Sequence, residues 1–367
     1  MPYPSQAICC VVTRDYLPGL IILYRSVLKY QRLPLYLLVV DADSDALPEL
    51  HRLIHAQIPD AAPEELIMVD FADLLADDLP QVRFYYDAFE LATAAKAYLH
   101  FWMQHQTDIE HWLYLDTDMV CYGSLTPIFE QLRTSNFLLT PHCPNPCQNP
   151  SQDIQFLTAG AYNGGLLGVT RSADSAAFTL WYKQVLTHYC LNDPPLAVGD
   201  RFVQSTVLFV DQRWLDLVPA YFRGVAIAAE RGFNLGHWNV GQDRLYWNET
   251  QLCIGSEDVL LLHLSGFLPE ASNRLSKHSP IDWADSNTWL DIHLQQKTAL
   301  ETLQQEFTFS YPYANYPDGS SIPKSHRRAY LKHLMAGGSP VANPFLHKAD
   351  FERVCRPTPG KTHYRWA

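Results

Sequence analysis

Two aspartates that stand two positions apart carry the clearest chemical signal in this sequence. Asp116 and Asp118 follow the apolar run from Trp112 to Leu115, which we expect to be a buried strand. If the chain turns there, both carboxylates reach one small volume, and a divalent cation relieves their repulsion. Oxygen ligands suit Mg²⁺ or Mn²⁺, and such an ion is well placed to bridge a diphosphate. An ordinary surface turn accounts for the pair equally well, so both interpretations stay open.

Two further features could complete such a site. Asn163 and the glycine pair beginning at Gly164 precede an apolar stretch. Glycine permits close backbone approach to a ligand, and an amide offers both a donor and an acceptor. His263 ends the run VLLL, and its neutral ring nitrogen could be a third metal ligand if it reaches the same sheet edge. Gly266, just beyond, would let the backbone approach phosphate. Taken singly, a turn into a strand and a structural histidine are the simpler explanations.

Alternating strand-like and helix-like segments in the first 270 residues must position these side chains. We expect strands at 7–12, 35–40, 66–69, 112–115 and 259–262, and helices at 20–28, 47–54 and 88–103. The alternation predicts an α/β fold with a mainly parallel central sheet flanked by helices, which generally binds ligands at the carboxyl ends of its strands. Residues 141–153 are rich in Pro, Asn and Gln and predict a surface loop. A helix near 289–307 precedes a tail rich in Tyr, Pro and Gly.

Composition excludes several classes of protein. With 27 Lys and Arg against 39 Asp and Glu, the net charge is −12, which argues against a nucleic-acid partner. The eight cysteines lack the spacing of a disulfide framework or zinc site and predict a reducing compartment. We find no signal peptide and no transmembrane run. We therefore expect a cytoplasmic location, with peripheral association at a membrane left open. The motifs of dinucleotide oxidoreductases, P-loop kinases and the commonest hydrolases are absent.

In this order, the motifs resemble those of nucleotide-sugar glycosyltransferases of the GT-A fold, and most closely the bacterial enzymes around glycosyltransferase family 8. The resemblance spans roughly residues 7–277 and rests on ICCVVTRDY, YLDTDMV, YNGGLLGV, DQRW, GFNLGHWN and HLSGF. It implies a catalytic domain over 1–270 that binds metal and nucleotide sugar. Residues 271–367 would form a helical and loop extension, for which we expect a role in capping the acceptor side.

The resemblance also implies roles for individual residues around the metal and the nucleotide. The cation, Mn²⁺ or Mg²⁺, would be held by Asp116, Asp118 and His263. The base and ribose pocket would be lined by Thr13, Asp15, Tyr16 and Asp41. Lys96, on the helix before the aspartate pair, resembles a basic position that contacts the donor. For Lys96, Asp41 and Asp211 taken singly, a solvated surface position is the simpler explanation.

A second group of residues would surround the transferred sugar and the phosphates. Asn163 and Gly164 would face the sugar, while Asp211 and Gln212 would lie near its anomeric carbon or the acceptor. Family 8 members commonly continue past the histidine as HxxGxxKPW, and this chain lacks that lysine. Phosphate contact would then pass to Ser276 or Lys277, beside Gly266.

The implied function is transfer of a hexose from a nucleotide sugar, with a UDP-sugar as the expected donor, to a hydroxyl acceptor in bacterial glycan or glycoconjugate synthesis. The acceptor, whether saccharide, lipid-linked glycan, protein or small molecule, stays open. So do the oligomeric state and the stereochemistry, because Asp211 could serve as a base for direct inversion.

Two alternatives are weighed against this interpretation. The sequence DTDMV also fits the opening motif of haloacid-dehalogenase-like phosphohydrolases, with Asp116 as the nucleophile. That motif normally closes the first strand of its domain, whereas at least three strand signals come earlier here. The other alternative is a non-catalytic sugar-nucleotide-binding protein of the same fold, and the retained aspartates and histidine disfavour it.

Overall fold

A mixed sheet of seven strands forms the centre of the molecule, in the order β3-β2-β1-β4-β7-β6-β8. The computed structural model describes residues 5–75, 78–146, 150–192 and 208–355. The strands are β1 (Gln6–Val12), β2 (Leu35–Val39), β3 (Leu66–Val69), β4 (His111–Leu115), β6 (Phe137–Pro141), β7 (Tyr162–Thr170) and β8 (Val225–Ile227). Strand β7 runs antiparallel to both neighbours, and the other pairs in this sheet are parallel. The prediction of an α/β fold with a mainly parallel sheet is confirmed.

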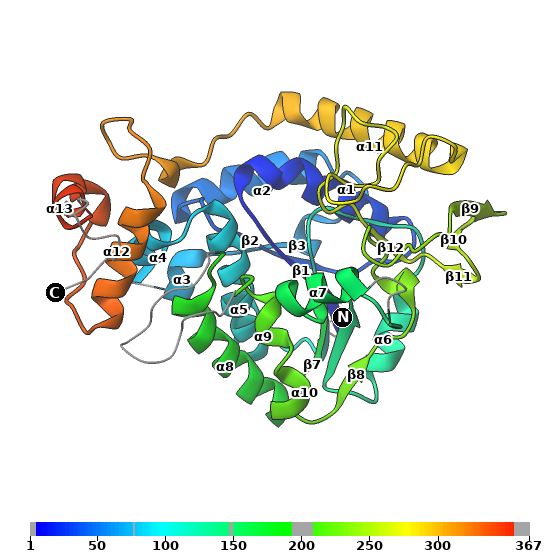
Figure 1. Ribbon diagram of the computed structural model, residues 1–367, viewed down its shortest axis with the longest axis horizontal. Helices are drawn as coiled ribbons and strands as arrows, with labels where there is room; N and C mark the ends of the chain where they lie inside the picture. The colour runs from blue at the N-terminus through cyan, green and yellow to red at the C-terminus, as the bar shows by residue number, and fades with distance from the viewer. Residues whose placement is uncertain (1–4, 76–77, 147–149, 193–207, 356–367) are drawn as a thin grey trace.

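Helices cover both faces of this sheet, which explains why its strands read as continuous apolar runs. One face packs against α1 (Leu17–Leu28), α2 (Leu47–Ala56) and α6 (Thr126–Leu132). The other packs against α4 (Leu79–Tyr85), α5 (Ala88–Gln106) and α8 (Ala173–Tyr189). Figure 1 shows α1 and α2 above the sheet and α5 and α8 below it. No helix in the described ranges is long and apolar enough to cross a membrane.

Two smaller sheets accompany the seven-stranded one. Strand β5 (Met119–Cys121) pairs antiparallel with β12 (Leu261–His263), and this register places His263 opposite Met119. A separate three-stranded sheet consists of β9 (Leu245–Asn248), β10 (Gln251–Ile254) and β11 (Glu257–Asp258). The short β5–β12 pair therefore carries a distant part of the chain to the turn that follows β4.

The residues beyond 270 pack directly on the rest of the chain. Helix α11 (Asn287–Glu306) lies along α1, and α12 (Lys324–Met335) contacts α4. Arg327 of α12 is buried and donates hydrogen bonds to the carbonyl oxygens of Phe84 and Tyr86 at 2.6 and 2.8 Å. The expected division into 1–270 and 271–367 stays a prediction, although apolar residues from both parts share the same clusters.

Three segments differ from what their composition suggests. Of the predicted loop at 141–153, residues 147–149 lie outside the described residues, and 150–153 begin helix α7 (Pro150–Ala159). The prediction is wrong there because proline is well tolerated at the first helical position. The glycine pair lies within strand β7 rather than in a turn before it. The predicted tail contains two helices, α12 and α13 (Lys348–Val354).

Candidate metal centre

The turn after β4 and the end of β12 bring three ligating side chains together. Asp116 donates its backbone N–H to the Gly165 carbonyl oxygen at 2.8 Å and accepts from the N–H of Met119 at 3.2 Å, which fixes the turn. The ligand atoms of Asp116, Asp118 and His263 all lie within 4.8 Å of one another. His263 Nε2 lies 3.0 Å from Asp118 Oδ1. The three predicted metal ligands therefore share one small volume.

The second ring nitrogen of His263 is held by an amide. His263 Nδ1 lies 3.1 Å from Asn234 Oδ1, and because that oxygen only accepts, the ring donates its Nδ1–H to it. The Asn234 amide group donates in turn to Asn163 Oδ1 and to Thr140 Oγ1, both at 2.9 Å. Such a second partner orients a metal-binding histidine and leaves Nε2 for the ion. This donor set fits Mn²⁺ or Mg²⁺, with two carboxylates and one imidazole as ligands.

Lys96 lies directly behind the aspartates. Its Nζ is 3.0 Å from Asp116 Oδ1 and 3.1 Å from Asp211 Oδ2, and it donates to the Gly164 carbonyl oxygen at 3.0 Å. The side chain comes from α5 and is only 5% exposed, so the interpretation of Lys96 as a solvated surface charge is wrong. It bridges the metal centre to Asp211, which is also buried.

The glycine pair of β7 allows the centre to be this compact. A Cβ atom on Gly165 would lie 2.4 Å from His263 Cε1 and 2.8 Å from Asp116 Oδ2, so no larger residue fits there. Gly164 donates its N–H to Gln212 Oε1 at 3.2 Å. Gln212, at the start of α9 (Gln212–Leu215), donates its amide to the Ala159 carbonyl oxygen at 2.9 Å. The residues predicted to face the sugar therefore lie on β7 or beside it, next to the predicted metal ligands.

The predicted base and ribose residues follow strands β1 and β2. Asp41 is buried and accepts from Arg14, from its backbone N–H at 2.9 Å and from its Nε at 3.3 Å. Thr13 is buried, Asp15 is exposed, and Tyr16 is 61% exposed. Burial, together with the charges of Asp15 and Asp118, raises the pKa of Tyr16. Tyr16 therefore lies near enough to Asp118 for their charges to interact, and its role in nucleotide binding stays a prediction.

Gly266 and Lys277, the predicted phosphate contacts, meet in the loop after β12. Lys277 donates its backbone N–H to the Gly266 carbonyl oxygen at 2.8 Å. Gly266 is partly exposed, and the Lys277 side chain is exposed. Their contact with phosphate stays a prediction.

The electrostatics of the centre follow from burial and unequal charge. Burial acts to raise the pKa of Asp118, but the charge of His263 and its hydrogen bond outweigh burial and lower that pKa. Burial lowers the pKa of His263, but the charge of Asp118 and its hydrogen bond raise that pKa by more. The net shift of the His263 pKa is therefore upward. Burial raises the pKa of Asp211 against the opposing charge of Lys96. The surroundings therefore favour the ionised form of Asp118 and disfavour that of Asp211, relative to a free aspartate.

Several supporting residues were not assigned to the site from the sequence. Tyr114 donates its hydroxyl to Asp116 Oδ1 at 2.8 Å, and the Tyr182 hydroxyl lies 3.4 Å from Asp211 Oδ2. Tyr114 could have been found, because it precedes Asp116 by two residues on a strand and alternate residues share a face. Trp238 is also buried near the site, and its indole N–H has no partner among the described residues.

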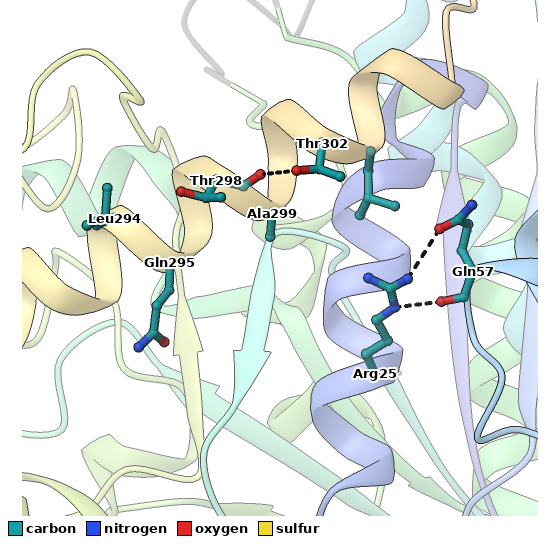
Figure 2. A pocket seen from close by; sticks show the side chains of 8 residues that line it. Arg25, Gln57, Leu294, Gln295, Thr298, Ala299 and Thr302 are labelled. Atoms are coloured by element: carbon teal, nitrogen blue, oxygen red, sulfur yellow. Dashed lines mark hydrogen bonds between the residues drawn. The ribbon is translucent and has the colours of Figure 1, made fainter.

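A groove of about 500 Å³ lies elsewhere, between α1, the end of α2 and α11. Figure 2 shows Arg25 of α1 beside Gln57. Arg25 donates to Gln57 through Nε at 2.6 Å and through Nη2 at 3.3 Å. The groove is lined by none of the predicted site residues.

Comparison with known proteins gives distant relatives. No protein-family model matches the chain. The uncharacterized protein YfnF of Bacillus subtilis (strain 168) is 23% identical over 278 residues, which is 74% of this chain and 85% of YfnF. The uncharacterized protein YfnD of the same organism is 22% identical over 175 residues, covering 48% of this chain and 52% of YfnD.

Among solved structures, the similar ones include glycosyltransferases. The galactosyltransferase LgtC with donor and acceptor sugar analogs has a TM-score of 0.47 at 14% identity and covers 82% of this chain and 99% of its own. Mouse xyloside xylosyltransferase 1 has a TM-score of 0.42 at 11% identity, covering 70% and 97%. The glycosyltransferase GlyE of Streptococcus pneumoniae TIGR4 has a TM-score of 0.44 at 14% identity, covering 85% and 67%. At TM-scores below 0.5, the activity of this chain has to be inferred from its own residues, and membership of family 8 stays a prediction.

Proposed function

We propose that this chain is a metal-dependent glycosyltransferase that moves a hexose from a nucleotide sugar, with UDP as the expected nucleotide, to a hydroxyl acceptor in bacterial glycan synthesis. One observation carries the proposal. Asp116, Asp118 and His263 converge within 4.8 Å at the carboxyl end of β4, with the far nitrogen of His263 fixed by Asn234. A site of this kind lies where open α/β sheets bind their ligands.

Charge supports a divalent ion in particular. Asp116, Asp118 and Asp211 contribute three negative charges, and Lys96 contributes one positive charge, so the ionised cluster with neutral His263 carries 1 − 3 = −2. When bound, Mn²⁺ or Mg²⁺ supplies positive charge that stabilises a departing diphosphate without proton transfer. The two aspartates and the histidine would hold that ion.

The neighbouring residues would position the sugar. Asn163 and Gly164 lie on β7 beside the triad, and Gln212 holds Gly164 through its amide oxygen. Asp211 is buried and paired with Lys96 at 3.1 Å. Burial raises the pKa of Asp211 against the charge of Lys96, so an electrostatic role and that of a base for direct inversion both stay open for this carboxylate.

The phosphohydrolase alternative fits the geometry less well. The aspartate pair follows β4, after three earlier strands of the sheet, rather than the first strand. In a phosphohydrolase of this kind, the carboxylate of Asp116 would be the nucleophile. One of its two oxygens, Oδ1, already accepts a hydrogen bond from the Tyr114 hydroxyl and contacts Lys96.

A panel of nucleotide sugars, with and without Mn²⁺ and scored for release of nucleoside diphosphate, tests the proposal. We expect release from one UDP-sugar only when the metal is present. Turnover of a generic phosphate ester with no cleavage of any nucleotide sugar would favour the phosphohydrolase. Metal-dependent binding of a nucleotide sugar without release, across a panel of hydroxyl acceptors, would favour the non-catalytic protein.

A further inference from the structure

Two imidazoles from separate segments lie side by side next to the metal centre. The ring centroids of His237 and His278 are 5.6 Å apart. His237 also contacts the ring of Trp238, with centroids 5.1 Å apart. Trp238 in turn lies edge-on to the metal ligand His263, with centroids 5.0 Å apart. This chain of ring contacts places the pair beside the predicted cation.

Hydrogen bonds hold His278 against the loop that follows His263. The Ser276 hydroxyl donates to the Ser265 carbonyl oxygen at 2.7 Å and accepts from the backbone N–H of His278 at 3.1 Å. Gly266 has a φ of +71°, a backbone conformation that favours glycine. A Cβ atom there would lie 2.6 Å from His278 Cδ2. Glycine at 266 therefore leaves the space that the imidazole of His278 occupies.

These groups offer hydrogen-bond donors that the described part of the protein does not use. Neither imidazole makes a hydrogen bond there, and neither do the N–H groups of Ser265 and Gly266. His237 is half-buried and His278 is exposed. Burial, and then the neighbouring His278, lowers the pKa of His237 to about 4, so this ring is neutral at pH 7 and offers one N–H. Unused N–H groups near a candidate cation site suit anionic oxygens.

We propose that His237 and His278 bind the diphosphate of the nucleotide sugar through their ring N–H groups. The proposal rests on the proposed function. Ser276 is a weaker candidate for this contact, because it is buried and its hydroxyl already has two partners in the loop. Its role is to position His278.

The experiment measures binding to the full chain by calorimetry, first of Mn²⁺ alone and then, with Mn²⁺ saturating, of UDP and of inorganic pyrophosphate. The variants are His237→Phe, His278→Phe and their combination, which keep a ring but remove its nitrogens. His278→Lys restores a donor, Lys277→Met tests the neighbouring cation, and His105→Asn is the control because His105 is an exposed histidine on α5. Circular dichroism checks folding. If the double variant unfolds, the single variant His278→Phe still tests the proposal, because His278 is exposed.

We expect the double variant to bind Mn²⁺ like the wild type but to lose about tenfold or more in affinity for both UDP and pyrophosphate. His278→Lys should recover most of the affinity for UDP and pyrophosphate that His278→Phe loses. Unchanged affinity in a folded double variant would overturn the proposal, and so would a loss confined to UDP, which would place the imidazoles on the nucleoside. A loss seen only for Lys277→Met would return phosphate contact to that lysine. If the wild type binds Mn²⁺ but neither anion, the proposed function fails together with this inference.

Discussion

Two D-x-D sequences follow two strands of the same sheet, and they have different surroundings. Asp41 and Asp43 come after β2, and each has its own arginine. Arg14 Nε lies 3.3 Å from Asp41, and Arg83 Nη1 lies 2.6 Å from Asp43. The acids at the end of β2 are therefore neutralised within the protein.

The pair after β4 lacks this balance. Asp116 shares Lys96 with Asp211, and Asp118 contacts only His263 among the ion pairs of the described residues. The side chain of Asp118 is 40% exposed, so an ion from solvent can reach it. The same two-residue spacing thus gives a closed ion-pair cluster at β2 and a candidate cation site at β4. The two strand ends differ in the number of positively charged side chains beside their aspartates.

The largest effect is expected from Asp118→Asn. This change removes a charged metal ligand while keeping the size of the side chain, so Mn²⁺ binding should be lost. Release of nucleoside diphosphate should fall on the order of 10³-fold or more, because the metal supplies several kcal/mol of charge stabilisation. Calorimetry with Mn²⁺ and the release assay measure the two effects.

The matched control for that experiment is Asp43→Asn, the same substitution at the second aspartate of the β2 pair. It should leave Mn²⁺ binding unchanged because Arg83 already neutralises Asp43. If Asp118→Asn kept the wild-type rate and affinity with metal present, the metal centre would be wrongly assigned. Loss of Mn²⁺ binding in both variants would remove the distinction between the two strand ends.

Lys96→Met tests the cation behind β4. Removing it leaves Asp116 and the buried Asp211 without a permanent positive charge, and breaking a buried ion pair in this way costs about 3–5 kcal/mol in the free energy of unfolding. Adding Asp211→Asn should recover part of that loss. Urea unfolding measures both, with the exposed Lys29→Met as the matched control. Equal stability of the Lys96 and Lys29 variants would show that the charge cluster does not depend on Lys96.

The ends of the strands could be predicted well from the sequence. The side chains that lie beside those ends in space could not. The apolar runs of β1, β2 and β4 are covered by helices on both faces, so their bounds follow from local composition. The meeting of His263 with the aspartates depends on the pairing of β5 with β12, two short strands far apart in the chain. No local pattern contains such information.

The burial of charged residues also could not be predicted from the sequence. Lys96 was expected to be solvated as a single charge, yet it lies buried between two acids. Arg327 is a second buried charge, and its partners are carbonyl oxygens at the end of α4. In both cases the partners are distant in sequence, and burial of a charge depends on them.

A smaller effect concerns His100, four residues after Lys96 on α5. Trp112 Nε1 donates to His100 Nδ1 at 2.9 Å, and burial, with the charge of Lys96, lowers the pKa of His100 to about 3. Between pH 6.5 and 3 the unfolded chain therefore binds a proton that the folded chain does not. Stability should fall with decreasing pH by up to about 1.4 kcal/mol per pH unit from this group. His100→Gln keeps an acceptor that does not titrate, so its urea midpoint should depend less on pH. An unchanged pH dependence would exclude His100 as the source.

The smallest effect is expected for the stability of Asp43→Asn. Its side chain is 67% exposed although Arg83 is buried, and solvent around an exposed carboxylate limits the contribution of the pair to about 1 kcal/mol in the free energy of unfolding. Arg83 would keep its hydrogen bonds to the carbonyl oxygens of Val40 and Ala42, at 3.2 and 2.7 Å. Urea unfolding beside Lys96→Met compares the two strand ends directly. A loss as large as that of Lys96→Met would mean that the buried Arg83 depends on Asp43 for its charge balance, and that the two carbonyl oxygens do not hold it without that carboxylate.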